Sequence, residues 1–237
     1  MALPQEELRF NTVEETVEAF RNGEFIIVLD SEDRENEGDL IIAADSITTR
    51  KMGLHGQTFE VSMDGYICAP ILPDLATHLE LPQMVSQSTD PHRTAYTVSI
   101  DSNDPLVTTG ISAHNRALTC RTLASPDVKP SSFRRPGHIL PLQAKVGGVR
   151  ERRGHTEATV DFCRLAGKFP AGVICELVED GESPEGVAEQ SGGGMLRRDG
   201  CLKFGKKWGI KVCTIEALVE YLEKTEGPLP VVNGKHS

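Results

Sequence analysis

The sequence predicts an α+β fold, in which helices flank a mixed β-sheet within a single domain. Segments with helical and with strand-like patterns are mixed along the whole chain, which is typical of such folds. Two neighbouring apolar runs, 25–29 and 40–44, predict buried strands joined by a short loop. No internal repeat or linker divides the 237 residues, a length that suits one large core. We therefore expect a single catalytic domain over 1–237, with an ordered core at about 12–224 and a flexible tail at 225–237.

The first half of the chain begins with a well-marked helix. Thr12 and Glu15 form a capping box for a helix at 12–20, and Asn22-Gly23 ends it because both residues tolerate a left-handed backbone. The strand at 25–29 follows, then an acidic loop and the strand at 40–44. The further expected elements are a helix at 48–57, a strand at 66–71, a helix at 74–81, a polar loop at 83–93 and a strand at 95–100.

In the second half, Ser112 is the expected cap of a helix that runs to about Leu123. Three prolines predict a loop at 125–137, and glycines with charged residues predict a mobile excursion at 180–200. The remaining elements are a strand at 138–146, a helix at 156–166, a strand at 172–178, a helix at 200–207, a strand at 210–213 and a helix at 215–224.

Composition limits the class of protein. A formal net charge of -10 disfavours a nucleic-acid partner, because such binders must neutralise phosphates. No apolar run approaches the roughly 18 residues needed to span a bilayer, and the amino terminus lacks a signal pattern. We therefore expect a cytoplasmic protein without a membrane partner. The 6 cysteines form no C-x-x-C pair, which argues for reduced thiols rather than a zinc site or a disulfide framework.

The most unusual stretch is the acidic loop 30–39, in which six of ten residues are carboxylates and Arg34 is the single cation. Carboxylates crowded between two anchored strands repel one another, and a divalent cation would relieve that repulsion. An EF-hand is excluded, because placing Gly38 at position 6 leaves Ala44 where a glutamate ligand is required. Two interpretations remain: a solvated acidic turn, or a hard-cation site that uses one or two of Glu35, Glu37 and Asp39.

A second candidate site is the basic segment 150–157, which precedes a helix expected to start at Thr156. A helix amino terminus favours anions and arginine matches phosphate, while Gly154 would let a ligand approach the backbone. His155 is a candidate metal ligand or proton carrier. The alternative is a solvated basic turn capped by threonine.

Other signals are weaker. His138 follows a Pro-Gly turn and suits a general base, although surface histidines in turns are commoner. Hydroxyls and backbone N–H groups at 107–112 suit either a phosphate cradle or ordinary helix capping. Glu176 ends an apolar strand and would be an acid/base candidate on a central strand, but would face water on an edge strand. Cys68 is expected to be a small core residue.

Five segments, in this order, resemble those of one enzyme family, 3,4-dihydroxy-2-butanone 4-phosphate synthase. They are DRENEGDL at 33–40, TTGISA at 108–113, RPGH at 135–138, RGHTEA at 153–158 and PAGVICEL at 170–177. The resemblance covers about residues 12–224, and several motifs in order are far more specific than one. It implies a lyase of riboflavin biosynthesis that converts ribulose 5-phosphate to 3,4-dihydroxy-2-butanone 4-phosphate and formate. It also implies a Mg²⁺ requirement, with Mn²⁺ as a possible substitute, and a homodimer whose active sites lie at the subunit interface.

The resemblance also implies roles for particular residues. Glu35 and His155 match the metal ligands of the family, and His138 and Glu176 match positions essential for activity. Glu37 and Asp39 complete the expected supply of acid/base groups. The expected substrate-binding residues are Arg34, Glu35, Asp39, Cys68, Thr109, Arg152, Arg153, Gly154, His155, Thr156 and Glu176.

Two other functions remain open on the residues alone. One is a different metal-dependent sugar-phosphate enzyme, such as an isomerase or an aldolase, and the other is a non-catalytic regulator that binds metal or phosphate. The segment 180–198 is longer than expected for bacterial members of the family. The number of metals per site, the first general base and any redox role of the cysteines stay open at this level.

Overall fold

The computed structural model describes residues 8–53, 61–62, 66–179, 193–229, 231–232 and 235–236. Its centre is a seven-stranded sheet in the order β10-β1-β2-β7-β4-β6-β5. The β1–β10 and β4–β6 pairs are parallel and the others antiparallel, so the predicted mixed sheet is confirmed. The strands of this sheet are β1 (Ile26–Leu29), β2 (Gly38–Ala43), β4 (Cys68–Ile71), β5 (Ile100–Ser102), β6 (Phe133–Gln143), β7 (Gly172–Glu176) and β10 (Lys211–Thr214).

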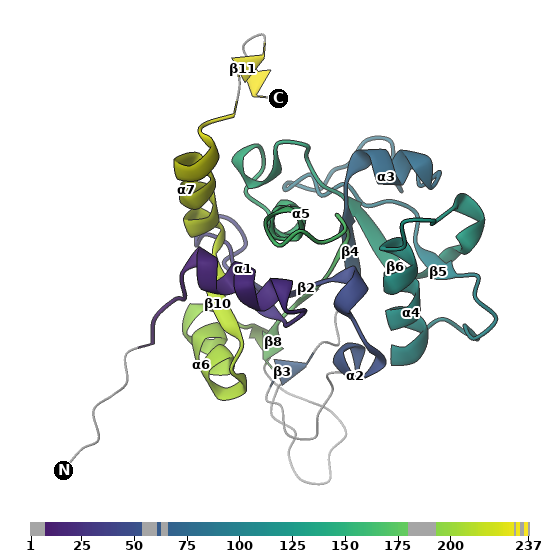
Figure 1. The fold of residues 1–237 in the computed structure, drawn as a ribbon, viewed down its shortest axis with the longest axis horizontal. Coiled ribbons are helices and arrows are strands. Elements are labelled where there is room, and N and C mark those ends of the chain that lie inside the picture. Colours follow the sequence, from purple (N-terminus) through teal and green to yellow (C-terminus); the bar gives the residue numbers. More distant parts are fainter. Residues whose placement is uncertain are drawn as a thin grey trace.

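Helices cover both faces of this sheet (Figure 1). One core lies under α1, α5 and α7, and the other lies under α2, α3, α4 and α6. The bounds are α1 (Val13–Arg21), α2 (Thr49–Met52), α3 (Pro73–His78), α4 (Ala113–Leu123), α5 (His155–Leu165), α6 (Arg198–Trp208) and α7 (Ile215–Glu226). Three short 3₁₀ helices are η1 (Ala44–Ser46), η2 (Pro130–Ser132) and η3 (Gly148–Arg150).

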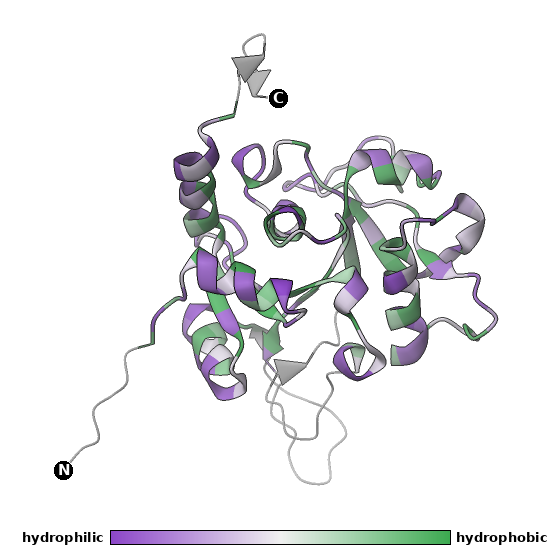
Figure 2. Cartoon of the chain, in the orientation of Figure 1, coloured by the Kyte–Doolittle hydropathy of each residue, from purple (hydrophilic) through white to green (hydrophobic). Residues whose placement is uncertain are grey.

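The central strands are apolar on both sides because both faces are covered. Along β1, Ile26 and Val28 pack in the core under α5, whereas Ile27 and Leu29 pack in the opposite core. Figure 2 shows the same pattern, with hydrophobic colour along the sheet and hydrophilic colour on the outer sides of the helices. The apolar runs were therefore read correctly as buried strands.

The predicted helix caps are also confirmed. Thr12 and Glu15 form the complete capping box of α1, and the hydroxyl of Ser112 accepts a hydrogen bond from the N–H of Asn115 at the start of α4. These signals are local, since each cap involves residues three positions apart.

Two expectations in the middle of the chain are wrong. The loop expected at 125–137 gives way to β6 from Phe133 onward, and the strand expected at 95–100 is reduced to isolated bridges before β5. The first part of β6 pairs with β5, whereas β4 pairs only from Leu140. One side of this part therefore has no strand partner in that sheet, and a proline there removes no ladder hydrogen bond.

Smaller differences concern element ends. The expected helix at 48–57 is α2, which stops at Met52, and residues 54–60 lie outside the described part. The strand expected at 172–178 is divided, because β8 (Val178–Glu179) leaves β7 to join β3 (Val61–Ser62) and β9 (Gly194–Met195). Most of the excursion expected at 180–200 lies outside the described residues, although α6 already starts at Arg198.

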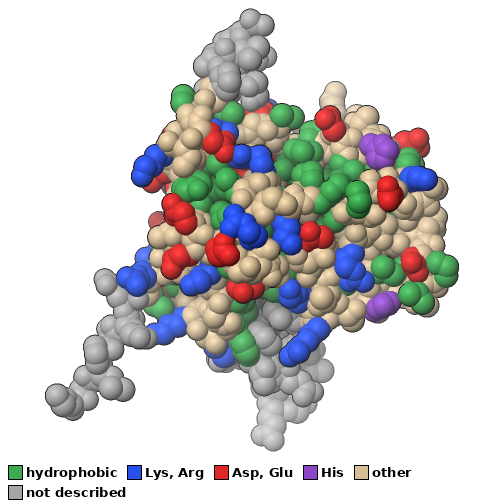
Figure 3. All heavy atoms as spheres, viewed as in Figure 1, with side chains coloured by type: hydrophobic (Ala, Val, Ile, Leu, Met, Phe, Trp, Pro, Cys, Tyr) green, Lys and Arg blue, Asp and Glu red, His purple; other side chains and the backbone are tan. Residues whose placement is uncertain are grey.

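At the carboxyl end, α7 continues to Glu226 and is followed by a pair of short strands, β11 (Val231–Val232) and β12 (Lys235–His236). Of the expected tail, residues 230, 233–234 and 237 lie outside the described part. Within the described ranges, no helix is both long and apolar enough to cross a membrane. On the face drawn in Figure 3, basic and acidic side chains are interspersed.

Candidate active site

The acidic loop is organised by its first residue. The carboxylate of Asp30 is buried and accepts hydrogen bonds from the backbone N–H of Glu35 at 3.1 Å and of Glu37 at 2.9 Å. It also accepts a hydrogen bond from Arg34 Nη1 at 2.7 Å. The loop is therefore wrapped around one buried carboxylate, and Asn36 adopts a left-handed backbone with φ 55° inside it. This ordered loop is not the solvated acidic turn that composition alone allowed.

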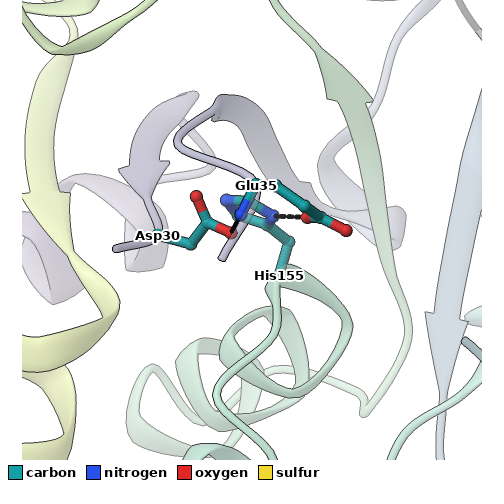
Figure 4. A group of neighbouring side chains, drawn as sticks. All are labelled: Asp30, Glu35 and His155. Atoms are coloured by element: carbon teal, nitrogen blue, oxygen red, sulfur yellow. Dashed lines mark hydrogen bonds and ion pairs between the residues drawn. The ribbon is translucent and has the colours of Figure 1, made fainter. Parts of the chain in front are cut away.

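His155 is the first residue of α5 and points at this loop from the neighbouring layer (Figure 4). Its Nε2 lies 3.1 Å from the carbonyl oxygen of Val28, which accepts a hydrogen bond from that nitrogen. Its Nδ1 faces the acidic loop, 3.7 Å from Glu35 Oε2 and 3.7 Å from Asp39 Oδ2. When the ring is neutral, this hydrogen bond keeps the proton on Nε2, and Nδ1 is then the nitrogen available to a metal ion.

The charges of this group perturb one another. Burial would raise the pKa of Glu35, but His155 and Arg34 outweigh it and lower the pKa to about 2. Burial raises the pKa of Asp39 to about 7, against the attraction of His155. The Asp39 and Glu35 carboxylates outweigh burial at His155 and raise its pKa to about 9. The two carboxylates therefore favour a positive charge beside them, which either a proton on His155 or a bound metal ion can supply.

The strand register brings Glu176 to the same place. Asp39 on β2 and Glu176 on β7 are direct antiparallel partners, so their side chains lie side by side on one face of the sheet. β7 is the fourth strand of seven, so Glu176 lies on a central strand, the position in which it was expected to be an acid/base candidate. The cavity beside it has a volume of about 60 Å³ and is lined by Arg34, Glu35, Asp39, Cys68, Thr94, Tyr96, Leu142, Arg152, His155, Thr156, Ile174 and Glu176.

Arg152 is held mainly by the protein itself. Its Nη1 is 2.5 Å from Glu157 Oε2, and that buried carboxylate also accepts the backbone N–H of Lys145. Its Nε and Nη2 donate to the carbonyl oxygen of His92, and Nη2 also donates to the hydroxyl of Thr94. Four of the five N–H groups that a guanidinium carries are thereby used, which leaves one for a ligand. Arg153, in contrast, is exposed.

The remaining predicted residues form a second group. His138 on β6 is not among the residues that line the cavity beside Glu35, and it lines another of about 510 Å³ with Tyr66, Ile111 and Arg116. Its backbone N–H and its Nδ1 both contact the buried carboxylate of Asp101, at 3.0 and 2.9 Å. Thr109 is exposed on the segment beside it. Gly110 follows with φ 93°, and a Cβ there would collide with both Asp101 and His138.

Several site residues were not found from the sequence. Asp30, Asp101 and Glu157 each hold a predicted residue in place, and His92 stands with its Nε2 3.9 Å from Glu35 Oε1. Asp30 and Glu157 lay within segments already noted, so a search for buried carboxylates there could have found them. His92 and Asp101 carried no such local signal.

The donors present suit a divalent cation. Asp30, Glu35 and His155 each offer a ligand atom within 4.8 Å of the others, but both oxygens of Asp30 are occupied by loop hydrogen bonds. Among the described residues, Asp39 Oδ1 is buried and has no hydrogen-bond partner. Glu35 and His155 Nδ1 therefore remain as candidate metal ligands, and Asp39 Oδ2 lies 3.7 Å from that nitrogen. Carboxylates suit Mg²⁺ and Mn²⁺, and imidazole suits the softer divalent ions.

Comparisons with known proteins agree on one family. A family model described as 3,4-dihydroxy-2-butanone 4-phosphate synthase matches residues 14–221. The synthase of that name from Pyricularia oryzae is 56% identical over 220 residues, which cover 93% of each chain. Riboflavin biosynthesis protein RibBA of Aquifex aeolicus is 44% identical, and the match covers 98% of this chain and 54% of that protein.

Solved structures show the same likeness. A crystal structure of 3,4-dihydroxy-2-butanone 4-phosphate synthase in complex with two magnesium ions superposes with a TM-score of 0.88 at 56% identity, over 93% of this chain and 100% of that chain. A cation-free form of the synthase superposes with a TM-score of 0.84 at 55% identity, over 92% of this chain and 100% of that one. The matched region contains the acidic loop, α5 and β7. The chain therefore belongs to the 3,4-dihydroxy-2-butanone 4-phosphate synthase family, whose members are enzymes of riboflavin biosynthesis.

Proposed function

We propose that the enzyme converts D-ribulose 5-phosphate to L-3,4-dihydroxy-2-butanone 4-phosphate and formate, with Mg²⁺ as its metal and Mn²⁺ as a possible substitute. The observation that carries this proposal is the meeting of His155 Nδ1 with Glu35 and Asp39 beside Glu176 on the central strand. A related synthase crystallised with two magnesium ions supports the choice of metal. Family membership supports the substrate.

The proposed metal ligands are Glu35 and His155, with Asp39 close enough to bind metal or substrate. When bound, the metal supplies Lewis-acid stabilisation of negative charge on the vicinal oxygens of the sugar. Val28 contributes by holding the Nε2 of His155, so that the imidazole keeps one orientation and one tautomer. Arg34 contributes by pairing with Glu35 and Asp30, which keeps the loop closed around its carboxylates.

The chemistry moves protons at several carbons, because it removes one next to a carbonyl, eliminates water, migrates a carbon and releases formate. We assign these transfers to Glu37, Asp39, His138 and Glu176. Burial raises the pKa of Glu37 and of Asp39, which suits groups that must both accept and return a proton. The buried Asp101 orients the ring of His138 in the same way that an aspartate orients a catalytic histidine in other enzymes.

The phosphate is assigned to the start of α5. Gly154 is the N-cap of this helix and provides no side-chain cap, so the N–H groups of the first turn are the proposed anion donors. The side chains of Arg152 and Glu157 lie where a Cβ of Gly154 would be, so the phosphate would share this space with them. Thr156 and Arg152 line the cavity there, and Arg153 is exposed. Cys68 lines the cavity as a thiol, because burial raises its pKa well above the usual range. Thr109 is assigned to the group around His138.

Incubation with ribulose 5-phosphate and Mg²⁺ tests the reaction. We expect one formate for each ribulose 5-phosphate consumed, because the five carbons of the substrate equal the four carbons of the product plus the one of formate. We expect EDTA to stop both substrate loss and formate release, because it removes the divalent metal. Formate is measured with formate dehydrogenase, and the four-carbon product by carbon-13 NMR. Substrate loss without formate would instead support a metal-dependent isomerase or aldolase. Binding without turnover would support a regulator.

We also propose a homodimer in which the two groups of residues meet across the subunit interface. Two observations support it: His138 lines a cavity different from that of Glu35 and His155, and Tyr66 and Ile111 beside it are 75% and 58% exposed. Exposed apolar side chains around a polar dyad are typical of a surface that a partner covers.

Subunit complementation tests this arrangement. Glu35→Gln and His138→Ala should each be inactive as homodimers, but a mixed dimer should hold one intact site. If co-expressed subunits assort at random, about a quarter of wild-type activity should return, since half of the dimers are mixed and each has one of two sites. Mixed dimers without activity would overturn the shared site. A fully active protein that light scattering shows to be a monomer would overturn the proposed homodimer.

A further inference from the structure

The turn Asp90–Thr94 lies at the edge of the candidate metal site, and several hydrogen bonds fix its conformation. The carboxylate of Asp90 accepts the N–H of His92 at 3.2 Å and the N–H of Thr94 at 2.7 Å. Arg93 has φ 53°, a left-handed conformation that non-glycine residues rarely adopt. The conformational strain of such a backbone at a single residue is commonly found at functional sites.

A second contact fixes the same turn from the active-site side. The carbonyl oxygen of His92 accepts hydrogen bonds from Arg152 Nε at 3.1 Å and Nη2 at 3.0 Å. Arg152 is in turn paired with the buried Glu157 at the start of α5. The backbone of His92 is therefore tied, through Arg152 and Glu157, to the helix that carries His155.

The two carboxylate oxygens of Glu35 have different neighbours, and His92 is the neighbour of one of them. Glu35 Oε2 faces Arg34 at 2.5 Å and His155 Nδ1 at 3.7 Å, whereas Oε1 faces His92 Nε2 at 3.9 Å. An N–H···O hydrogen bond of ordinary length would need a shift of about 1 Å, which a side chain that is 35% exposed can make. The oxygen that does not face His155 would then have a donor of its own.

On this geometry, and resting on the proposed metal role of Glu35, we propose that His92 is a positioning residue that donates a hydrogen bond from Nε2 to Glu35 Oε1 and so orients the carboxylate for the metal. Carboxylate ligands are commonly held by such an outer donor, and its loss typically costs 10- to 100-fold in metal affinity, as a rough guide. His92 touches neither substrate nor metal in this role, and acts through Glu35 alone.

The test is metal affinity without substrate, measured with Mn²⁺ by electron paramagnetic resonance and with Mg²⁺ by calorimetry at one pH. His92→Leu removes the donor, and we expect its dissociation constant to rise about tenfold or more. His92→Gln places an amide N–H near the position of Nε2 and should restore most of the affinity. Asp90→Ala loosens the turn and should weaken binding in the same direction. His114→Leu, which removes an exposed imidazole on α4, is the matched control and should bind metal as the wild type does.

Two results would overturn the role of His92. One is unchanged metal affinity in His92→Leu. The other is a loss that His92→Gln does not restore and that is accompanied by a lower melting temperature, which would indicate a purely structural residue. If the wild-type protein itself bound no divalent cation, the proposed metal centre would fail as well, so the two failures are distinguishable.

Discussion

Replacing Glu35 with glutamine should reduce turnover at least about 1,000-fold, the equivalent of some 4 kcal/mol of transition-state stabilisation. The amide keeps the size of the side chain but removes its charge, which His155 and Arg34 hold on it so firmly that the pKa lies at about 2. Without that charge the donor set loses its most acidic ligand. Initial rates of formate release at saturating Mg²⁺ and ribulose 5-phosphate measure the effect, with circular dichroism to confirm the fold.

Two further variants make this result specific. His155→Ala should abolish metal-dependent turnover in the same way, because it removes the Nδ1 that faces Glu35 and Asp39. Glu32→Gln is the matched control: this residue lies in the same loop and is exposed, so activity should not change. Full activity in Glu35→Gln or His155→Ala would show that the metal is held elsewhere.

Replacing Asp30 with alanine should disorder the acidic loop and destabilise the protein by about 3–5 kcal/mol. Its carboxylate is buried and pairs with Arg34, so removal leaves that partly buried cation with Glu35 alone and two backbone N–H groups without an acceptor. Urea unfolding should report the lost stability, and turnover should fall because Glu35 and Glu37 lose their anchor.

Asp33→Ala, at an exposed position of the same loop, is the control that distinguishes the loss of a negative charge from the loss of the buried hydrogen bonds. It removes one negative charge as Asp30→Ala does, but no buried hydrogen bonds, and both stability and turnover should stay near wild type. If the two variants lost equal stability, net charge in the loop would matter more than the hydrogen bonds of Asp30.

Features that depend on neighbouring residues could be predicted from the sequence. The start of α5 was predicted within one residue, and the caps Thr12 and Ser112 were predicted correctly, because each signal spans a single helical turn. β6 was missed in part, since its first half is a strand only through its pairing with β5, and Pro136 together with the two prolines before the strand argued locally for a loop.

The candidate site was likewise predicted from the sequence only in part. The chain alone indicated that Glu35, Asp39 and His155 belong together, but only through the resemblance of several distant motifs. The sequence also pointed to Arg152 as a phosphate ligand. In the structure, most of its donors are engaged by His92, Thr94 and Glu157, so any contact with phosphate uses what remains.

The sequence by itself determined the two buried strands around an acidic loop, the helix after the basic segment, which it placed one residue late at Thr156, and the family whose motifs these are. Apolar runs, caps and motif order are written in consecutive residues, so they can be read without a fold. Only the tertiary structure decided that Asp30 anchors the loop, that Val28 orients His155, and that His138 lies in a second cavity. Those partners are brought together by strand pairing and helix packing, because the distances between side chains remote in sequence are set by the packed core.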